Sequence, residues 1–110
     1  MPVIQVTAPR ATDDPTRDPA RLASLCAAVA DALGLPPSGV VATLCEATVT
    51  TTGAGPVTAW PLAVLHGSDR GEHATTAALA AAARSLAEGW EVPPGEVWVT
   101  WSTGAPPTRG

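Results

Sequence analysis

The chain has 110 residues, the size of one domain, and 45 % of them are hydrophobic. Because it has no Phe and no Tyr, we expect a thin core of Ala, Val and Leu, and oligomerisation that buries further apolar surface. All six cationic residues are arginines and face ten carboxylates, a net charge of −4 that argues against a nucleic-acid partner, since phosphate binding needs clustered positive charge.

The first half of the chain predicts a strand, a helix and a second strand. Residues 2–8 are β-branched and uncharged, which favours a strand. After a polar loop, Asp18 is expected to cap a helix whose first residue is Pro19. Apolar residues follow at helical spacing, and Gly34 is expected at the C-terminal cap. A second strand is expected over residues 40–48.

The second half predicts a hairpin, a strand, a helix and a last strand. Residues 50–58 contain Gly-Ala-Gly-Pro between β-branched residues, which indicates a small hairpin. A third strand is expected over residues 60–65. An alanine-rich helix is expected over 74–88, with Gly89 as its stop, and a strand over 97–101.

The two halves repeat in element order and in residues. Residues 36–44 parallel residues 93–101, and residues 2–4 match 61–63 at nearly the same offset. This pattern predicts an internal duplication in which each β-α-β half is a right-handed parallel unit.

We therefore expect a single domain over residues 1–110, made of halves at about 2–50 and 60–103. Its class is α+β, with a four-stranded mixed sheet and two helices on one face. The Pro- and Gly-rich tail from Gly104 is expected to fray.

The remaining composition predicts a cytoplasmic protein without metal or cofactor. No apolar run approaches the roughly 18 residues of a membrane span, and the first residues lack the basic flank of a signal peptide. Cys26 falls on a predicted helix and Cys45 in a predicted strand, and we expect both to be buried, reduced thiols. Neither the cysteines nor the histidines have metal-ligand spacing.

A strand that starts directly after the initiator, at Pro2, in a doubled β-α-β chain resembles the tautomerase superfamily. That superfamily includes 4-oxalocrotonate tautomerase, macrophage migration inhibitory factor and cis-3-chloroacrylic acid dehalogenase. Residues 7–11 look like the end of the first strand of the inhibitory-factor branch. Residues 65–73 are similar to the dehalogenase branch, which has a His-Gly pair followed by two arginines, and residues 97–101 fit the last strand of both.

The resemblance implies chemistry at Pro2 after an aminopeptidase has removed Met1. An exposed α-amino group has a pKa of about 7.7–8.0, and burial beside an arginine lowers that pKa. The neutral amine would act as a general base, and the protonated amine as a general acid. The alternative is structural, because proline is tolerated at the first residue of a strand. A retained Met1 would make the Pro2 nitrogen a non-basic amide.

The resemblance also implies an arginine that binds a substrate carboxylate, at Arg70. A guanidinium can bind a carboxylate bidentately and stabilise the enolate that develops. The alternative is a solvated loop arginine beside Asp69 and Glu72. His73 stands where the dehalogenase branch has its second arginine, and it is either a substrate contact or a surface histidine at a helix start.

Other candidates for substrate contact are Arg10, which follows the first strand, and residues of the last strand. Alternation places Trp98 and Thr100 on one face of the sheet and Trp101 on the other. These aromatic side chains either form a wall of the active site or pack in the core, and the same alternatives hold for Trp60.

Several family features are absent. Residues 40–43 lack the arginine of 4-oxalocrotonate tautomerase, and Leu35 stands where migration inhibitory factor has lysine. The last strand has no tyrosine, and the dehalogenase's C-terminal segment with its glutamate is missing. The substrate preference of any one member therefore does not transfer.

The preferred function is tautomerisation or isomerisation of a small 2-oxo acid or other enolisable carbonyl compound by a homotrimer, with Pro2 as base. One alternative is hydratase, decarboxylase or dehalogenase-like chemistry on a small unsaturated acid, with Pro2 as acid. Another is a catalytically silent trimeric ligand-binding module. A sheet with antiparallel neighbours throughout would favour such a module, and parallel pairing within each half would favour a tautomerase.

Overall fold

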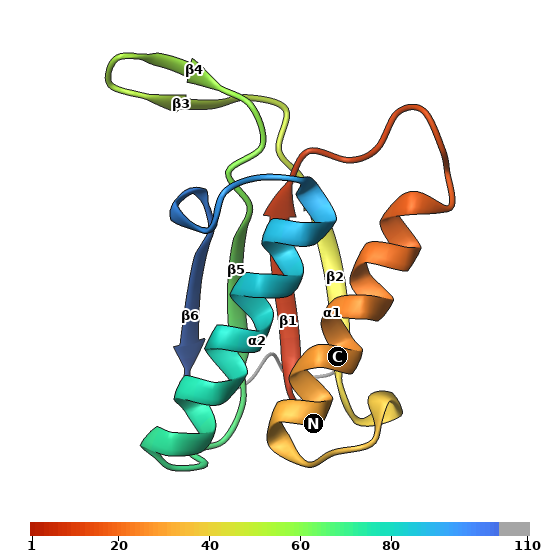
Figure 1. Cartoon of the computed structure of the whole chain (residues 1–110), viewed down its shortest axis with the longest axis vertical. Helices are drawn as coiled ribbons and strands as arrows, with labels where there is room; N and C mark the ends of the chain where they lie inside the picture. Colours follow the sequence, from red (N-terminus) through yellow and green to blue (C-terminus); the bar gives the residue numbers. More distant parts are fainter. Residues whose placement is uncertain (104–110) are drawn as a thin grey trace, which may run out of the picture.

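The computed structural model describes residues 1–103 as a four-stranded sheet with two helices on one face (Figure 1). The sheet order is β2-β1-β5-β6. This arrangement confirms the predicted α+β class, and the tail from Gly104 lies outside the described residues. The elements are β1 (Val3–Ala8), α1 (Arg17–Leu33), β2 (Val41–Glu46), β3 (Thr50–Thr52), β4 (Gly55–Val57), β5 (Leu62–His66), α2 (Glu72–Trp90) and β6 (Trp98–Ser102).

Strand directions separate the two architectures left open by the sequence. β1 pairs parallel with β2, and β5 pairs parallel with β6. The central pair, β1 with β5, is antiparallel. Parallel pairing within each half is the arrangement expected of a tautomerase, and it excludes a sheet that is antiparallel throughout.

The two halves have the same element order and also form equivalent backbone hydrogen bonds. The carbonyl of Pro2 accepts a hydrogen bond of 3.1 Å from the Val41 N–H, and the carbonyl of Pro61 accepts one of 3.0 Å from the Trp98 N–H. Both prolines directly precede a central strand, and both side chains are fully buried. Pro2 and Pro61 are therefore equivalent positions at opposite ends of the sheet.

The start of α1 differs from the prediction. The N-cap is Thr16, and Asp18 lies within the first turn. Its carboxylate accepts the backbone N–H of Ala11 at 3.0 Å, so it ties the preceding loop to the helix instead of capping it. Pro19 is accommodated because the first turn of a helix leaves its N–H groups without intrahelical partners.

The end of α1 matches the prediction and the end of α2 does not. Gly34 caps α1 with a φ of 69°. α2 continues through Gly89 to Trp90 and is capped by Glu91, with a φ of 56°. A Cβ at Gly89 would lie at ordinary contact distance, 3.5 Å, from Arg21 Cγ on α1.

The core lies between the sheet and the helices and consists mainly of Ala, Val, Leu and Ile. Its residues are Ile4, Val6, Ala8, Leu25, Val29, Ala30, Val40, Ala63, Leu65, Ala78, Ala82, Leu86 and Trp90. Cys26 is half-buried against it. Cys45 is exposed, contrary to expectation, because its register partner Thr7 lies on the face of the sheet that the helices leave open.

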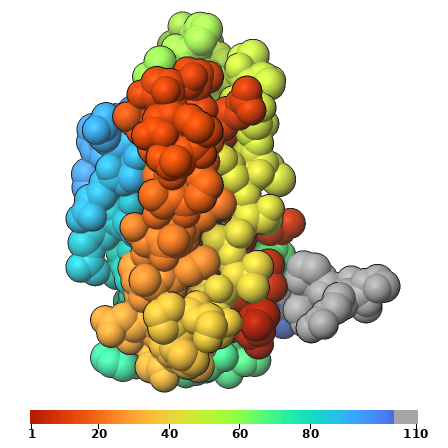
Figure 2. Space-filling model, turned by 90° about the vertical axis from the view of Figure 1, so that its right-hand side faces the viewer, coloured from red at the N-terminus to blue at the C-terminus, as the bar shows by residue number. Residues whose placement is uncertain are grey.

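The expected hairpin forms from β3 and β4 and projects from one end of the molecule. In Figure 2 it lies at the top and the first residues lie near the bottom. Among residues 1–103, no helix has both the length and the apolar character needed to cross a membrane.

Candidate active site

Pro2 lies at the start of the central strand β1 with its side chain fully buried. Its carbonyl is held by Val41, which fixes the backbone directly after the nitrogen. Met1 is 72 % exposed, so the peptide bond that would be cut to free the nitrogen lies next to a solvent-exposed residue. While Met1 is attached, the Pro2 nitrogen is an amide and cannot act as a base.

Arg70 lies at the same end of the sheet as Pro2. Val3 pairs with His66 at the end of β5, and the loop that follows β5 carries Arg70. The arginine is half-buried, and its Nε has no hydrogen-bond partner among residues 1–103. Asp69 accepts the Gly71 N–H at 2.9 Å within its own loop. Within the described chain, Arg70 forms no ion pair with Asp69, Glu72 or any other carboxylate.

A second polar group without a partner, the indole N–H of Trp101, lies at this end. Trp101 pairs with Leu65, on the helix side of the sheet, and its Nε1 is buried without a hydrogen-bond partner in the described part of the chain. Its ring packs against Gly67, so closely that a Cβ on Gly67 would lie only 2.8 Å from Trp101 Cζ2. The sequence offered Trp101 either as a wall of the active site or as a core residue, and alternation along the strand predicted its face but not its end of the sheet.

The other candidates are dispersed. His73 lies exposed in the first turn of α2, at the Pro2 end. Thr100 and Trp98 lie on the open face of the sheet, and Trp98 is 61 % exposed beside Leu62, at the opposite end. Arg10 also lies at that opposite end, so among the polar candidates Arg70 and His73 share an end with Pro2 within one chain.

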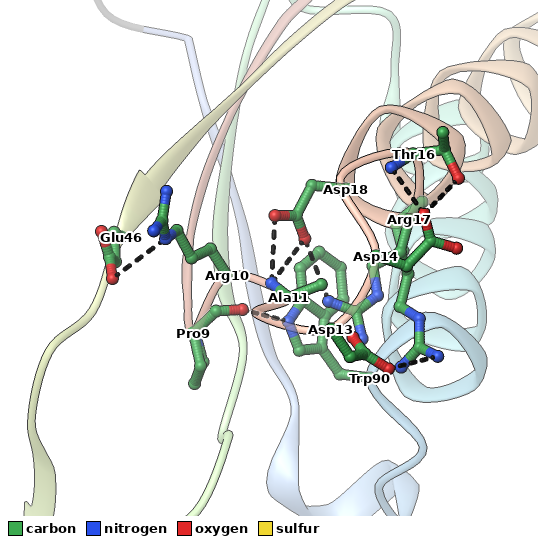
Figure 3. Close-up of polar contacts among 11 residues, drawn as sticks. Pro9, Arg10, Ala11, Asp13, Asp14, Thr16, Arg17, Asp18, Glu46 and Trp90 are labelled. Carbon is green, nitrogen blue, oxygen red and sulfur yellow. Dashed lines mark hydrogen bonds and ion pairs between the residues drawn. The ribbon is translucent and has the colours of Figure 1, made fainter.

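Arg10 belongs to a separate polar cluster at the other end of β1 (Figure 3). Its Nε lies 3.6 Å from Glu46 Oε1, an exposed ion pair. Nearby, the Trp90 indole N–H donates to the Pro9 carbonyl at 2.8 Å, which ties the end of α2 to the end of β1. Arg10 is thus an exposed loop residue that pairs with Glu46 at the opposite end of the sheet from Pro2.

Cys26 on α1 and Asp14 in the loop before it have pKa values shifted by their surroundings. Burial raises the pKa of the Cys26 thiol, which disfavours the thiolate and therefore nucleophilic chemistry there. The Thr16 hydroxyl and N–H lower the pKa of the Asp14 carboxyl. Within residues 1–103, no three His, Cys, Asp or Glu side chains gather where they could hold a metal ion.

Comparison with known proteins gives matches in structure and none in sequence. No protein-family model matches the sequence, and no curated protein sequence matches it significantly. Pt0534 inactivated by 2-oxo-3-pentynoate is 20 % identical, with a TM-score of 0.81 over 91 % of this chain and 83 % of that one. A wild-type fused 4-OT from an asymmetric trimer is 23 % identical, with a TM-score of 0.82 over 91 % and 84 %. Macrophage migration inhibitory factor from Giardia lamblia is 18 % identical, with a TM-score of 0.74 over 92 % and 97 %.

The chain has the tautomerase fold. The resemblance found in the sequence is therefore confirmed at the level of the fold. Within the tautomerase fold, this chain buries Pro2 at the end of the sheet that also carries the unpartnered Arg70 Nε and Trp101 Nε1.

Proposed function

We propose that this protein is a cytoplasmic, cofactor-independent tautomerase that isomerises a small 2-oxo acid or a related enolisable carbonyl compound. One observation carries the proposal. A fully buried proline at position 2, which becomes N-terminal once Met1 is removed, shares one end of the sheet with an arginine whose buried Nε has no partner among residues 1–103. An unsatisfied buried donor is uncommon in folded proteins, and a bound carboxylate would satisfy it.

The proposed reaction needs the Pro2 amine in its neutral form. Burial disfavours an ammonium ion, as does a guanidinium at the same end of the sheet, so we expect its pKa to lie below that of an exposed α-amino group. The neutral nitrogen takes a proton from the carbon beside the substrate carbonyl, and Arg70 pairs with the carboxylate and stabilises the enolate. The protonated proline then returns the proton to a different carbon or to the oxygen, which regenerates the amine.

The remaining candidates have smaller or separate roles in the proposal. His73 is exposed at the Pro2 end and would contact a substrate only at the mouth of the site. Trp98 and Thr100 lie on the open face, and Arg10 lies at the opposite end, so they would reach a Pro2 site only on a neighbouring copy.

We also propose a homotrimer, as in the fused 4-OT structure. The open face of the sheet supports this proposal, because it exposes the large apolar side chains of Val41, Leu62 and Trp98. A thin core gains stability when such a face is covered. Light scattering is expected to give the mass of three chains, and Trp98→Arg is expected to reduce it. A wild-type monomer at micromolar concentration would contradict this part of the proposal.

Ketonisation of enolised phenylpyruvate, followed by ultraviolet absorbance, tests the activity. Chains that have lost Met1 are expected to be active, and chains that retain it are expected to be inactive. Pro2→Ala is expected to lower kcat at least about 10²-fold, the lower end of a general-base contribution. Arg70→Gln is expected to raise KM about tenfold or more through loss of the charge-assisted pair.

The matched control is Arg84→Gln, which removes the same charge from an exposed position on α2 and should leave both constants unchanged. Activity that is lost as pH falls would indicate a base, and activity that is lost as pH rises would indicate an acid. Equal activity of the wild type and Pro2→Ala would overturn the proposal.

A further inference from the structure

A cavity of about 550 Å³ lies at the end of the sheet opposite Pro2, a volume typical of small-molecule sites. It is formed where β1 and β2 end, at the base of the β3–β4 hairpin and at the last residue of α2. Figure 2 shows this hairpin at the end of the molecule away from the first residues. Its lining includes Pro9, Arg10, Arg21, Ala59 and Trp90.

This end of the sheet is the counterpart of the Pro2 end in the duplicated chain. Pro61 holds the start of β6 as Pro2 holds the start of β2. The nitrogen of Pro61, however, is permanently bonded to Trp60, so no processing at the N-terminus can turn it into an amine. Any site at this end can bind a ligand but cannot use proline acid–base chemistry.

The inner wall of the cavity is formed by the Trp90 ring and by the Arg21 guanidinium that stacks over it. The Trp90 ring is fixed by its hydrogen bond to the Pro9 carbonyl, and the Arg21 guanidinium lies 4.5 Å from the ring centroid. Arg21 pairs through one nitrogen with Asp18 at 3.1 Å. Its side chain is only 12 % exposed, and its Nε is buried without a hydrogen-bond partner among the described residues.

The mouth of the cavity carries the second guanidinium. Arg10 is 61 % exposed, and its contact to Glu46 is long, at 3.6 Å. A guanidinium has five N–H donors, so each arginine keeps donors for a ligand beside its own carboxylate partner. The remaining wall is largely apolar, from prolines, valines and alanines of the loops and the hairpin base.

The backbone beside the cavity is strained. Ala59 and Trp60 have φ values of 63° and 62°, and two consecutive non-glycine residues in the left-handed region are uncommon. Ala59 lines the cavity. Such strain persists where the surrounding structure enforces it and is concentrated at ligand-binding and functional segments.

We propose that this cavity is a second, non-catalytic site for a small planar organic anion of the aromatic carboxylate class. The ring of the ligand packs against the apolar wall and Trp90, and its carboxylate is bound by Arg10 at the mouth, with Arg21 as the inner cation. The proposal is independent of the activity assigned to Pro2, because none of its residues lies at that end.

Titration of ¹⁵N-labelled Pro2→Ala protein with benzoate, followed by NMR, tests the proposal. The Trp90 indole signal and the backbone amides of residues 48–50 and 57–58 are expected to shift saturably. Arg10→Gln is expected to weaken binding about tenfold, as for loss of one charge-assisted pair, and this exposed substitution should not affect folding. Arg84→Gln removes the same charge outside the cavity and is expected to leave binding unchanged.

Benzyl alcohol serves as the neutral control ligand and is expected to bind at least tenfold more weakly than benzoate. Three results would overturn the proposal. They are the absence of saturable shifts at Trp90, equal binding of benzoate and benzyl alcohol, and shifts at Trp101 that disappear in Arg70→Gln while Arg10→Gln has no effect.

Discussion

Replacement of Gly67 by alanine is the sharpest structural test of the Pro2 end. The new Cβ would lie 2.8 Å from Cζ2 and 3.3 Å from Cη2 of Trp101, about 0.6 Å short of the 3.4 Å at which ordinary contact begins. The Gly67 backbone cannot easily yield, because its N–H donates to the Ser102 carbonyl at 3.1 Å. The half-buried Trp101 ring must therefore move.

Overpacking of this kind costs about 1–3 kcal/mol. Alanine recovers about 0.4–1 kcal/mol by restricting the unfolded chain, so we expect a net loss of up to about 2.6 kcal/mol. For a chain of this length, that loss lowers Tm by up to roughly 10 °C at fixed protein concentration. Differential scanning calorimetry measures the shift, and the Trp101 indole NMR signal should move with it.

Gly95→Ala is the matched control, because no atom lies within 4 Å of its new Cβ. Its Tm is expected to stay equal to that of the wild type or to rise slightly. If Gly67→Ala were as stable as Gly95→Ala, with an unmoved Trp101 signal, the packing of the ring over Gly67 would be wrong.

Three further predictions concern the loops and helix ends. Trp90→Phe removes a buried hydrogen bond and weakens a cation–π contact, so urea unfolding should show a loss of about 1–2.5 kcal/mol, and no loss would contradict the tie between α2 and β1. Asp18→Asn breaks a mostly buried ion pair and should lower the free energy of unfolding by about 1–2 kcal/mol. Asp13→Asn breaks an exposed ion pair and should lower it by less than about 0.5 kcal/mol, and equal losses for the two variants would refute this distinction. The pKa of Asp14 should lie below 3.8 in an NMR titration, because the Thr16 hydroxyl and N–H hydrogen-bond the carboxylate. Because the pKa of Asp14 is lower in the folded state, the ionised carboxylate stabilises the fold fully above pH 3.8, and this stabilisation is lost as pH falls through the folded-state pKa. Thr16→Val removes one hydrogen bond to the carboxylate and should raise this pKa.

Most of the fold could be predicted from periodicity and turn residues, and the errors lie at helix ends. The apolar spacing and Gly34 identified α1, but the loop before it uses Asp18 as an acceptor, which local sequence does not reveal. Gly89 looked like a stop signal, yet α2 continues through it to Trp90, whose indole N–H donates to the Pro9 carbonyl of the loop after β1. Tertiary contacts override local signals at these ends.

The candidate site could be predicted in part. The order of strands places Pro2 and Arg70 at one end, and that much follows from the doubled β-α-β pattern. The packing of Trp101 could not be predicted, because it depends on the absence of a side chain at Gly67, in the loop directly after β5. The exposure of Cys45 depends on which face the helices cover, which strand alternation alone leaves undecided.

The central claim is that Pro2 carries a reactive, neutral amine, and covalent labelling tests it most directly. The reagent is 2-oxo-3-pentynoate, used on a Cys26→Ser, Cys45→Ser variant so that no thiol competes. The amine adds to the alkyne, one π bond is lost, and the N–H proton moves to the neighbouring carbon, so the mass rises by one whole reagent. At pH 7 we expect one adduct per chain, on the N-terminal peptide and only on chains that have lost Met1. Chains without Met1 that remain unlabelled at the Pro2 nitrogen would contradict the account.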